Sequence, residues 1–116
     1  MLEVIGRTNL LDFSKAVKTR HMDERIRRVE AVNGLGKPQL SFECNTGHPN
    51  GNEIHTITDK GNIVIQNAAT RRIVTTLIAR PGQIARYFDL TGEKKPDNYE
   101  DLIYQAQTHV MSNLNN

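Results

Sequence analysis

The segment between Gln39 and Ala79 limits the fold most, because four short apolar or β-branched runs alternate there with clusters of turn-forming residues. The runs are 39–44, 53–58, 62–66 and 73–79. Such runs are typical of strands, and Gly, Asn and Pro are typical of turns. Turns as short as Asp59-Lys60-Gly61 join neighbouring antiparallel strands. The segment therefore predicts four strands, the last three of them joined as an antiparallel meander.

Helices are predicted on both sides of this segment. Between residues 9 and 32 the apolar residues recur at helical spacing, and a break near Thr19 would divide this part into two helices. Residues 83–88 have the pattern of one or two helical turns, and a C-terminal helix is predicted at 97–112. The predicted fold is therefore α+β: an N-terminal helix, or two, packed on a four-stranded antiparallel sheet, with a C-terminal helix.

Length and composition restrict the class of protein. A chain of 116 residues suits one domain spanning 1–116. The single cysteine, Cys44, excludes an internal disulfide and a cysteine-based zinc site. The four histidines lack metal-ligand spacing, and neither a membrane-spanning run nor a secretory signal is visible. We therefore expect a cytoplasmic domain with no membrane attachment, metal or cofactor, and the oligomeric state stays open.

The charge is unevenly distributed along the chain, although the net charge is only +2. No Asp or Glu occurs between residues 61 and 88, whereas the residues that follow are acidic. This basic stretch contains four arginines: Arg71, Arg72, Arg80 and Arg86. Such a distribution suits a face that binds a polyanion, and a merely solvated surface fits the charge pattern equally well.

The predicted N-terminal helix carries a second basic feature. Its members follow spacings of three, four and three residues: Lys18, His21, Arg25 and Arg28. Side chains at this spacing form one stripe, here beside the apolar face, at a groove margin where a phosphate could bind. The alternative is a charged flank whose long stems cover apolar surface.

Two further candidates lie in the predicted sheet. His55 is on a central strand, and its ordinary pKa near neutrality suits a general acid or base, although a structural role is the alternative. Thr75 and Thr76 fall on opposite faces of the last strand, so only one of them could line a site with His55.

The end of the last strand is the most distinctive stretch. Arg80 precedes a Pro-Gly bend that leads into a helix start, and the free N–H groups there favour an anion site. Gln83 would add a hydrogen bond to a phosphate or a base edge, and Arg86 follows three residues later. Alternatively, Arg80 pairs with an acidic residue such as Asp89.

A helix with H-M-D-E-R at 21–25, followed by a sheet whose late strand reads I-V-T-T-L-I-A-R-P-G-Q-I, resembles the small metal-independent ribonucleases of the barnase, colicin and RelE-type toxin superfamily. Residues 51–87 also resemble small phage or prophage proteins that read E-I-H-x-I-T and then L-I-A-R-P-x-Q-I-x-R-Y. The resemblance covers about residues 9–88, the expected ribonuclease-like core, and leaves the C-terminal helix as an addition.

The superfamily resemblance implies cleavage of RNA without metal, by attack of a ribose 2′-hydroxyl on the adjacent phosphorus. It assigns the acid or base role to His55 or His21, and phosphate binding to Arg80 and Arg25. Thr75 and Gln83 would orient the scissile group, and further RNA contacts would come from Lys18, Arg28 and Arg86. One departure stands out: Glu53 is the only acidic residue at an obvious general-base position on the central strands.

We therefore expect an RNA-cleaving or RNA-binding protein, with RNA and an antitoxin, immunity or host protein as partners. The alternative is a non-catalytic phage-type protein that binds a host protein or nucleoprotein through the same basic face, for instance as an inhibitor of a defence system. A DNA-associated regulator is a third reading, although no helix-turn-helix spacing supports it.

Overall fold

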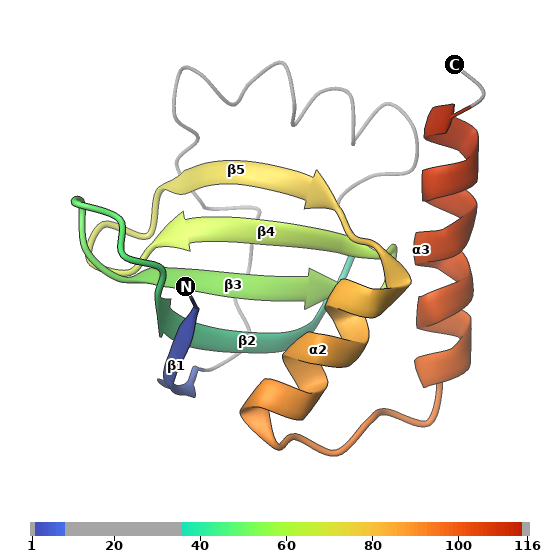
Figure 1. Cartoon of the computed structure of the whole chain (residues 1–116), viewed down its shortest axis with the longest axis horizontal. Coiled ribbons are helices and arrows are strands. Elements are labelled where there is room, and N and C mark those ends of the chain that lie inside the picture. Colours follow the sequence, from blue (N-terminus) through green and yellow to red (C-terminus); the bar gives the residue numbers. More distant parts are fainter. Residues whose placement is uncertain (1, 9–35, 115–116) are drawn as a thin grey trace.

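The computed structural model describes residues 2–8 and 36–114, with 109–114 described by their backbone. Five strands form one antiparallel sheet in the order of the sequence. The strands are β1 (Glu3–Arg7), β2 (Pro38–Asn45), β3 (Glu53–Thr58), β4 (Asn62–Asn67) and β5 (Ile73–Ile78). Two described helices follow the sheet, α2 (Pro81–Thr91) and α3 (Tyr99–Leu114) (Figure 1).

The core lies between one face of the sheet and the helix layer. In Figure 1, α2 crosses in front of the sheet toward β1, and α3 stands beside the sheet end at which β5 leads into α2. Because strand side chains alternate between faces, every second residue of the central strands points to the helices. The buried apolar residues of this layer include Leu40, Phe42, Ile57, Ile63, Ile84, Phe88 and Leu102.

The opposite face of the sheet is buried as well. Ile54, Thr56 and Val64 point away from α2 and α3 and have no exposed surface. The hydroxyls of Ser41 and Thr56 form a hydrogen bond of 2.8 Å across β2 and β3. The central strands are thus buried on both sides, which explains why they read as nearly continuous β-branched runs.

The prediction of an N-terminal helix packed on a four-stranded sheet is wrong. The sheet has a fifth strand, β1, which pairs with β2, and the described helices follow the sheet. The residue types of β1 do not alternate between apolar and polar, because Ile5 is apolar although 54% exposed and Gly6 has no side chain; burial does alternate along the strand, with Val4 packed toward the core. The helix predicted at 9–32 lies outside the described residues.

The positions of the four predicted strands and their meander connection are confirmed. The helix predicted at 83–88 is longer, since α2 starts at Pro81, which suits the first helical position. It ends at Thr91 and is capped by Gly92, whose φ of 66° is in the left-handed region that glycine adopts without steric cost. The C-terminal helix predicted at 97–112 corresponds to α3.

The turn between β3 and β4 makes close contact with α3. Gly61 in this turn has a φ of 74°, and a Cβ built on it would lie 2.9 Å from the Cα of Ala106. Only glycine fits this approach of two backbones. None of the described helices is long and apolar enough to cross a membrane.

Candidate functional site

A histidine, a carboxylate and a phenol are joined by hydrogen bonds beneath α2. Glu53 and His55 are two residues apart on β3, so both side chains point to the helix face. The Nε2 of His55 lies 3.2 Å from Glu53 Oε1, and its Nδ1 lies 2.9 Å from the hydroxyl of Tyr87 in α2. Thr46 Oγ1 donates to the same Oε1 at 3.2 Å. We call the first three residues the Glu53–His55–Tyr87 chain.

The positions of the protons in this chain follow from the partners. An ionised carboxylate only accepts, so His55 Nε2 carries a hydrogen and donates to Glu53. Burial lowers the pKa of His55 below its usual 6.5, against the opposing hydrogen bond and charge of Glu53, and the ring is therefore neutral at pH 7. Nδ1 then accepts from Tyr87, whose pKa is raised to about 12, mainly by burial. Every donor thus points toward the carboxylate.

The surroundings of the chain are apolar. The ring of Phe42 meets Tyr87 edge-on at 5.1 Å between centroids and lies 5.8 Å from the His55 ring. Cys44, buried nearby on β2, has a pKa raised to about 11, first by burial and then by the charges of Glu53 and Glu43. Its thiol stays protonated near neutral pH and is a poor nucleophile.

The chain reaches the surface through its carboxylate. The side chain of Glu53 is 14% exposed and that of His55 only 5%. Glu53 is the first residue of β3 and follows the loop at 46–52. No described residue forms a hydrogen bond with Glu53 Oε2. A ligand would therefore meet the carboxylate of Glu53, with the imidazole behind it.

A polar cleft of about 310 Å³ lies at the same end of the sheet. It is formed by the β2–β3 loop and the β4–β5 loop together with the end of β2. Its lining residues are Glu43, Asn50, Gly51, Asn52, Asn67, Ala68 and Ala69. Asn52 Nδ2 donates to Glu43 Oε2 at 3.1 Å, and Asn67 Nδ2 donates to the carbonyl of Asn50 at 3.3 Å. These hydrogen bonds connect the two loops to each other and to β2.

Thr75 shares a face of the sheet with His55. The pairing places His55 opposite Ile65, and Ile65 opposite Thr75. Two strand spacings, about 10 Å, therefore separate the backbones of His55 and Thr75. Thr76 is paired with Val64 and points to the other face. Of the two threonines, Thr75 is the one on the side of the Glu53–His55–Tyr87 chain.

Arg80 and Gln83 lie at the start of α2. Gln83 Oε1 accepts a hydrogen bond from the Arg80 N–H at 3.0 Å, so this glutamine caps the helix. Arg80 is exposed, and seven residues of α2, about 10 Å, separate it from Tyr87. Arg86 is exposed beside Tyr87, and its charge lowers the pKa of that hydroxyl, against the larger effect of burial. Among the predicted cations that the structure describes, Arg86 is the one beside the Glu53–His55–Tyr87 chain.

The four predicted residues of the N-terminal stripe lie outside the described residues: Lys18, His21, Arg25 and Arg28. Sequence reasoning named Glu53 only as an exception and did not identify Tyr87 or the cleft. The spacing of Glu53 and His55 was a usable signal, because residues two apart on a strand share a face. Tyr87 comes from another element and had no such signal.

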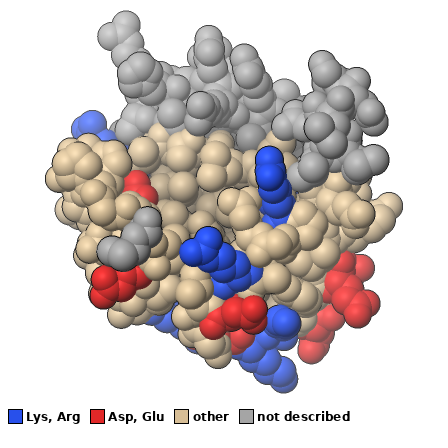
Figure 2. Space-filling view, in the orientation of Figure 1, with Lys and Arg blue, Asp and Glu red and all other residues tan. Residues whose placement is uncertain are grey.

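The described surface does not concentrate one sign of charge on the face shown in Figure 2, where Lys and Arg side chains lie in small groups beside Asp and Glu. Within residues 2–8 and 36–108, no group of three His, Cys, Asp or Glu side chains is placed to hold a metal ion. Comparison with protein-family models, curated proteins and solved structures found no match to this chain. The resemblance to ribonuclease toxins stays a prediction.

Proposed function

We propose that this protein binds single-stranded RNA and cleaves it by attack of a ribose 2′-hydroxyl on the neighbouring phosphorus. The observation that supports the proposal is the Glu53–His55–Tyr87 chain, which holds one carboxylate oxygen by two donors and leaves Oε2 open at the surface. A fixed carboxylate with a free oxygen suits the removal of a proton from a hydroxyl.

The proposed reaction assigns a role to each residue. Glu53 Oε2 takes the proton of the 2′-hydroxyl, the 2′-oxygen bonds to phosphorus, and the bond from phosphorus to the 5′-oxygen breaks. The leaving oxygen takes a proton from an acid, for which His21 is the sequence-based candidate. Arg86 would stabilise the negative charge on the phosphorane, since such charge stabilisation is usually the largest contribution. The products are a 2′,3′-cyclic phosphate and a 5′-hydroxyl.

The test is incubation of the purified protein with total RNA in EDTA. We expect the wild type to produce 2′,3′-cyclic phosphate ends. Glu53→Gln keeps the shape of the side chain but cannot take the proton, so its cleavage rate should fall by a factor of about 100 or more. Glu100→Gln, an exposed change on α3, is the matched control and should cleave like the wild type. Equal rates for Glu53→Gln and the control would contradict the assignment.

His55 acts through Glu53 and is a positioning residue in this proposal. His55→Gln still offers an N–H to Glu53 and an oxygen to Tyr87, whereas His55→Ala offers neither. We expect the glutamine variant to retain most of the activity that the alanine variant loses, with both compared at equal folded fraction. Equal loss in both variants would instead show that the imidazole itself exchanges protons.

A second candidate function is non-catalytic binding of a host protein. The observation that favours it is that His55 is only 4% exposed and both ring nitrogens already have partners, as in a histidine that serves the core. This alternative expects intact RNA in the EDTA assay and one host protein retained in stoichiometric amount.

A further inference from the structure

The polar cleft presents three asparagine amides and one carboxylate to a ligand. Asn67 is largely used by the protein, because its Oδ1 accepts from the N–H groups of Ala69 and Thr70 at 2.9 and 3.0 Å and one N–H of its Nδ2 donates to the carbonyl of Asn50. Glu43 Oε2 accepts from Asn52, and no described residue bonds to Glu43 Oε1. Glu43 Oε1 is thus an open oxygen of the one charged side chain in the cleft lining, and a ligand that binds it must bring a donor.

The β4–β5 loop on one side of the cleft holds an arginine in a strained conformation. Arg71 has a φ of 64° and is the one non-glycine residue with positive φ within residues 2–8 and 36–114. Glycine would occupy this position without steric cost, so an exposed arginine there points to a role for its side chain. Arg72 follows it and is also exposed. Guanidinium groups bind phosphate in a bidentate manner.

A ligand for this site needs a hydrogen-bond donor for Glu43 and a phosphate for Arg71. A nucleotide carries both. We propose that the cleft holds one unstacked base of single-stranded RNA that carries an exocyclic amino group, with Glu43 accepting from that group and Arg71 pairing with the adjacent phosphate. Cytosine, adenine and guanine carry such an amino group, and uracil does not. This assignment rests on the proposed function, because the cleft and Glu53 lie at the same end of the sheet; Glu43 pairs with Ile54 and therefore faces the side of the sheet opposite to Glu53.

The test measures binding of fluorescein-labelled hexanucleotides by anisotropy. The probes are 2′-O-methyl oligonucleotides, which cannot be cleaved: one of six uridines, the other with a single central cytidine. We expect the cytidine probe to bind the wild type about tenfold more tightly, as for a good contact with a base edge. In Glu43→Gln, which can still accept from Asn52, that preference should disappear, whereas Glu100→Gln should keep it.

A second variant tests the cleft without altering a charge. Ala69 is exposed and lines the cleft, so Ala69→Leu fills space there without disturbing the core. We expect it to reduce binding of the cytidine probe to the level of the uridine probe.

The outcomes separate the two proposals. Equal binding of both probes by the wild type, or a preference that survives in Glu43→Gln, overturns the cleft assignment, while cleavage of RNA in EDTA still supports the proposed function. Absence of both cleavage and binding overturns both. Loss of the preference in Glu43→Gln with unchanged cleavage of total RNA supports the assignment.

Discussion

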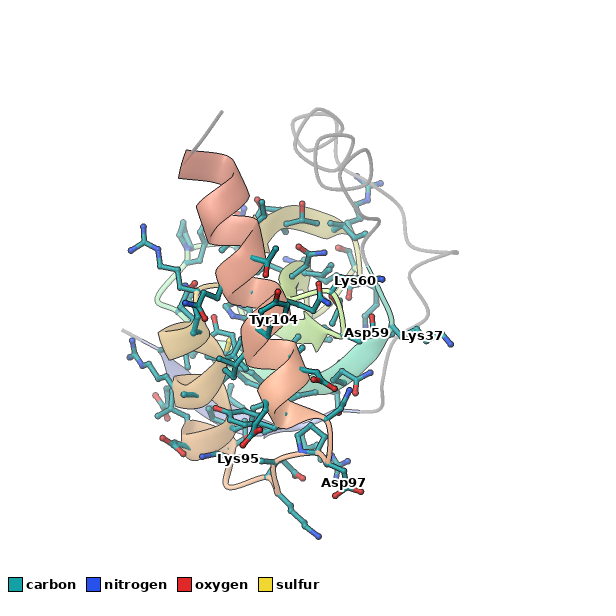
Figure 3. All side chains as sticks on the ribbon, turned by 90° about the vertical axis from the view of Figure 1, so that its right-hand side faces the viewer. Lys37, Asp59, Lys60, Lys95, Asp97 and Tyr104 are labelled. Atoms are coloured by element: carbon teal, nitrogen blue, oxygen red, sulfur yellow. The ribbon has the colours of Figure 1, made fainter. Side chains whose placement is uncertain are left out.

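The two ends of the sheet are built differently. At the turn end, Asp59-Lys60-Gly61 connects β3 to β4, and Asp59 Oδ1 accepts from the Lys37 N–H at 2.7 Å while Asp59 N–H donates to the Lys37 carbonyl at 2.8 Å. Figure 3 shows Lys37, Asp59 and Lys60 on one side of α3, which carries Tyr104. At the loop end, by contrast, two longer loops line an open cleft, a strained arginine is tolerated, and the carboxylate of Glu53 reaches the surface.

The difference indicates that the two ends of the sheet have different roles. The turn end has close backbone packing and no room for added atoms, as expected of a region that holds the fold together. The loop end has polar side chains that bond across loops and leave single oxygens open, as expected where a rigid scaffold presents a binding site. Changes at the turn end should therefore alter stability, and changes at the loop end should alter ligand binding more than stability.

The largest expected effect is at the turn end. Gly61→Ala combines a φ of 74° with a Cβ only 2.9 Å from the backbone of Ala106, and should reduce the free energy of unfolding by about 3 kcal/mol. Gly47→Ala at the loop end has a φ of 79° but nothing within 4 Å, and should lose only about 1 kcal/mol. Urea unfolding of both variants checks this, and equal losses would contradict the close packing of α3.

A smaller loss of stability is expected within the Glu53–His55–Tyr87 chain. Tyr87→Phe removes the donor to His55 Nδ1 and leaves a buried acceptor unpaired, which should cost about 1 to 2 kcal/mol. Tyr104→Phe is the matched control, because Tyr104 is 65% exposed and its loss of a hydroxyl should leave stability unchanged. A Tyr87→Phe protein as stable as the control would mean that the hydrogen bond contributes nothing.

The same chain predicts a pH dependence. Burial lowers the pKa of His55 in the folded protein below its unfolded value of 6.5, so the unfolded state binds more protons between these two values. The stability that neutral His55 contributes to the folded protein is therefore present above pH 6.5 and is lost as the pH falls through the pKa of the folded state. Urea unfolding at pH 7.5 and 5.5 should show a steeper loss for the wild type than for His55→Gln. Parallel losses would assign the pH dependence to other groups.

Local sequence patterns predicted strands β2 to β5. The edge strand β1 was not predicted, because it depends on a contact between residues far apart in the sequence. The turns around Gly61 and the β-branched runs depend on neighbouring residues, so their positions were readable. β1 was not, because Ile5 and Gly6 interrupt the alternation of apolar and polar residue types and its partner β2 is distant in the sequence. An edge strand with one covered face carries a weak signal.

The candidate site was predictable to the extent that it is local. His55 was identified by residue type, and Glu53 was within reach because the two share a strand face. Tyr87 is 32 residues from His55, and only the packing of α2 on the sheet brings its hydroxyl to the ring. The asparagines of the cleft read as turn formers, since the same side chains serve both purposes.

The smallest of the mutational effects has the opposite sign and separates stability from binding at the loop end. Arg71→Gly relieves the positive φ of 64° and should raise the free energy of unfolding by about 0.5 to 1 kcal/mol. Arg72→Gly, one residue later and without positive φ, should bring no gain. Because Arg71 is assigned to a phosphate, the stabilised variant should nevertheless bind the cytidine probe more weakly. A variant that is both more stable and equally tight would show that the strained arginine serves no ligand.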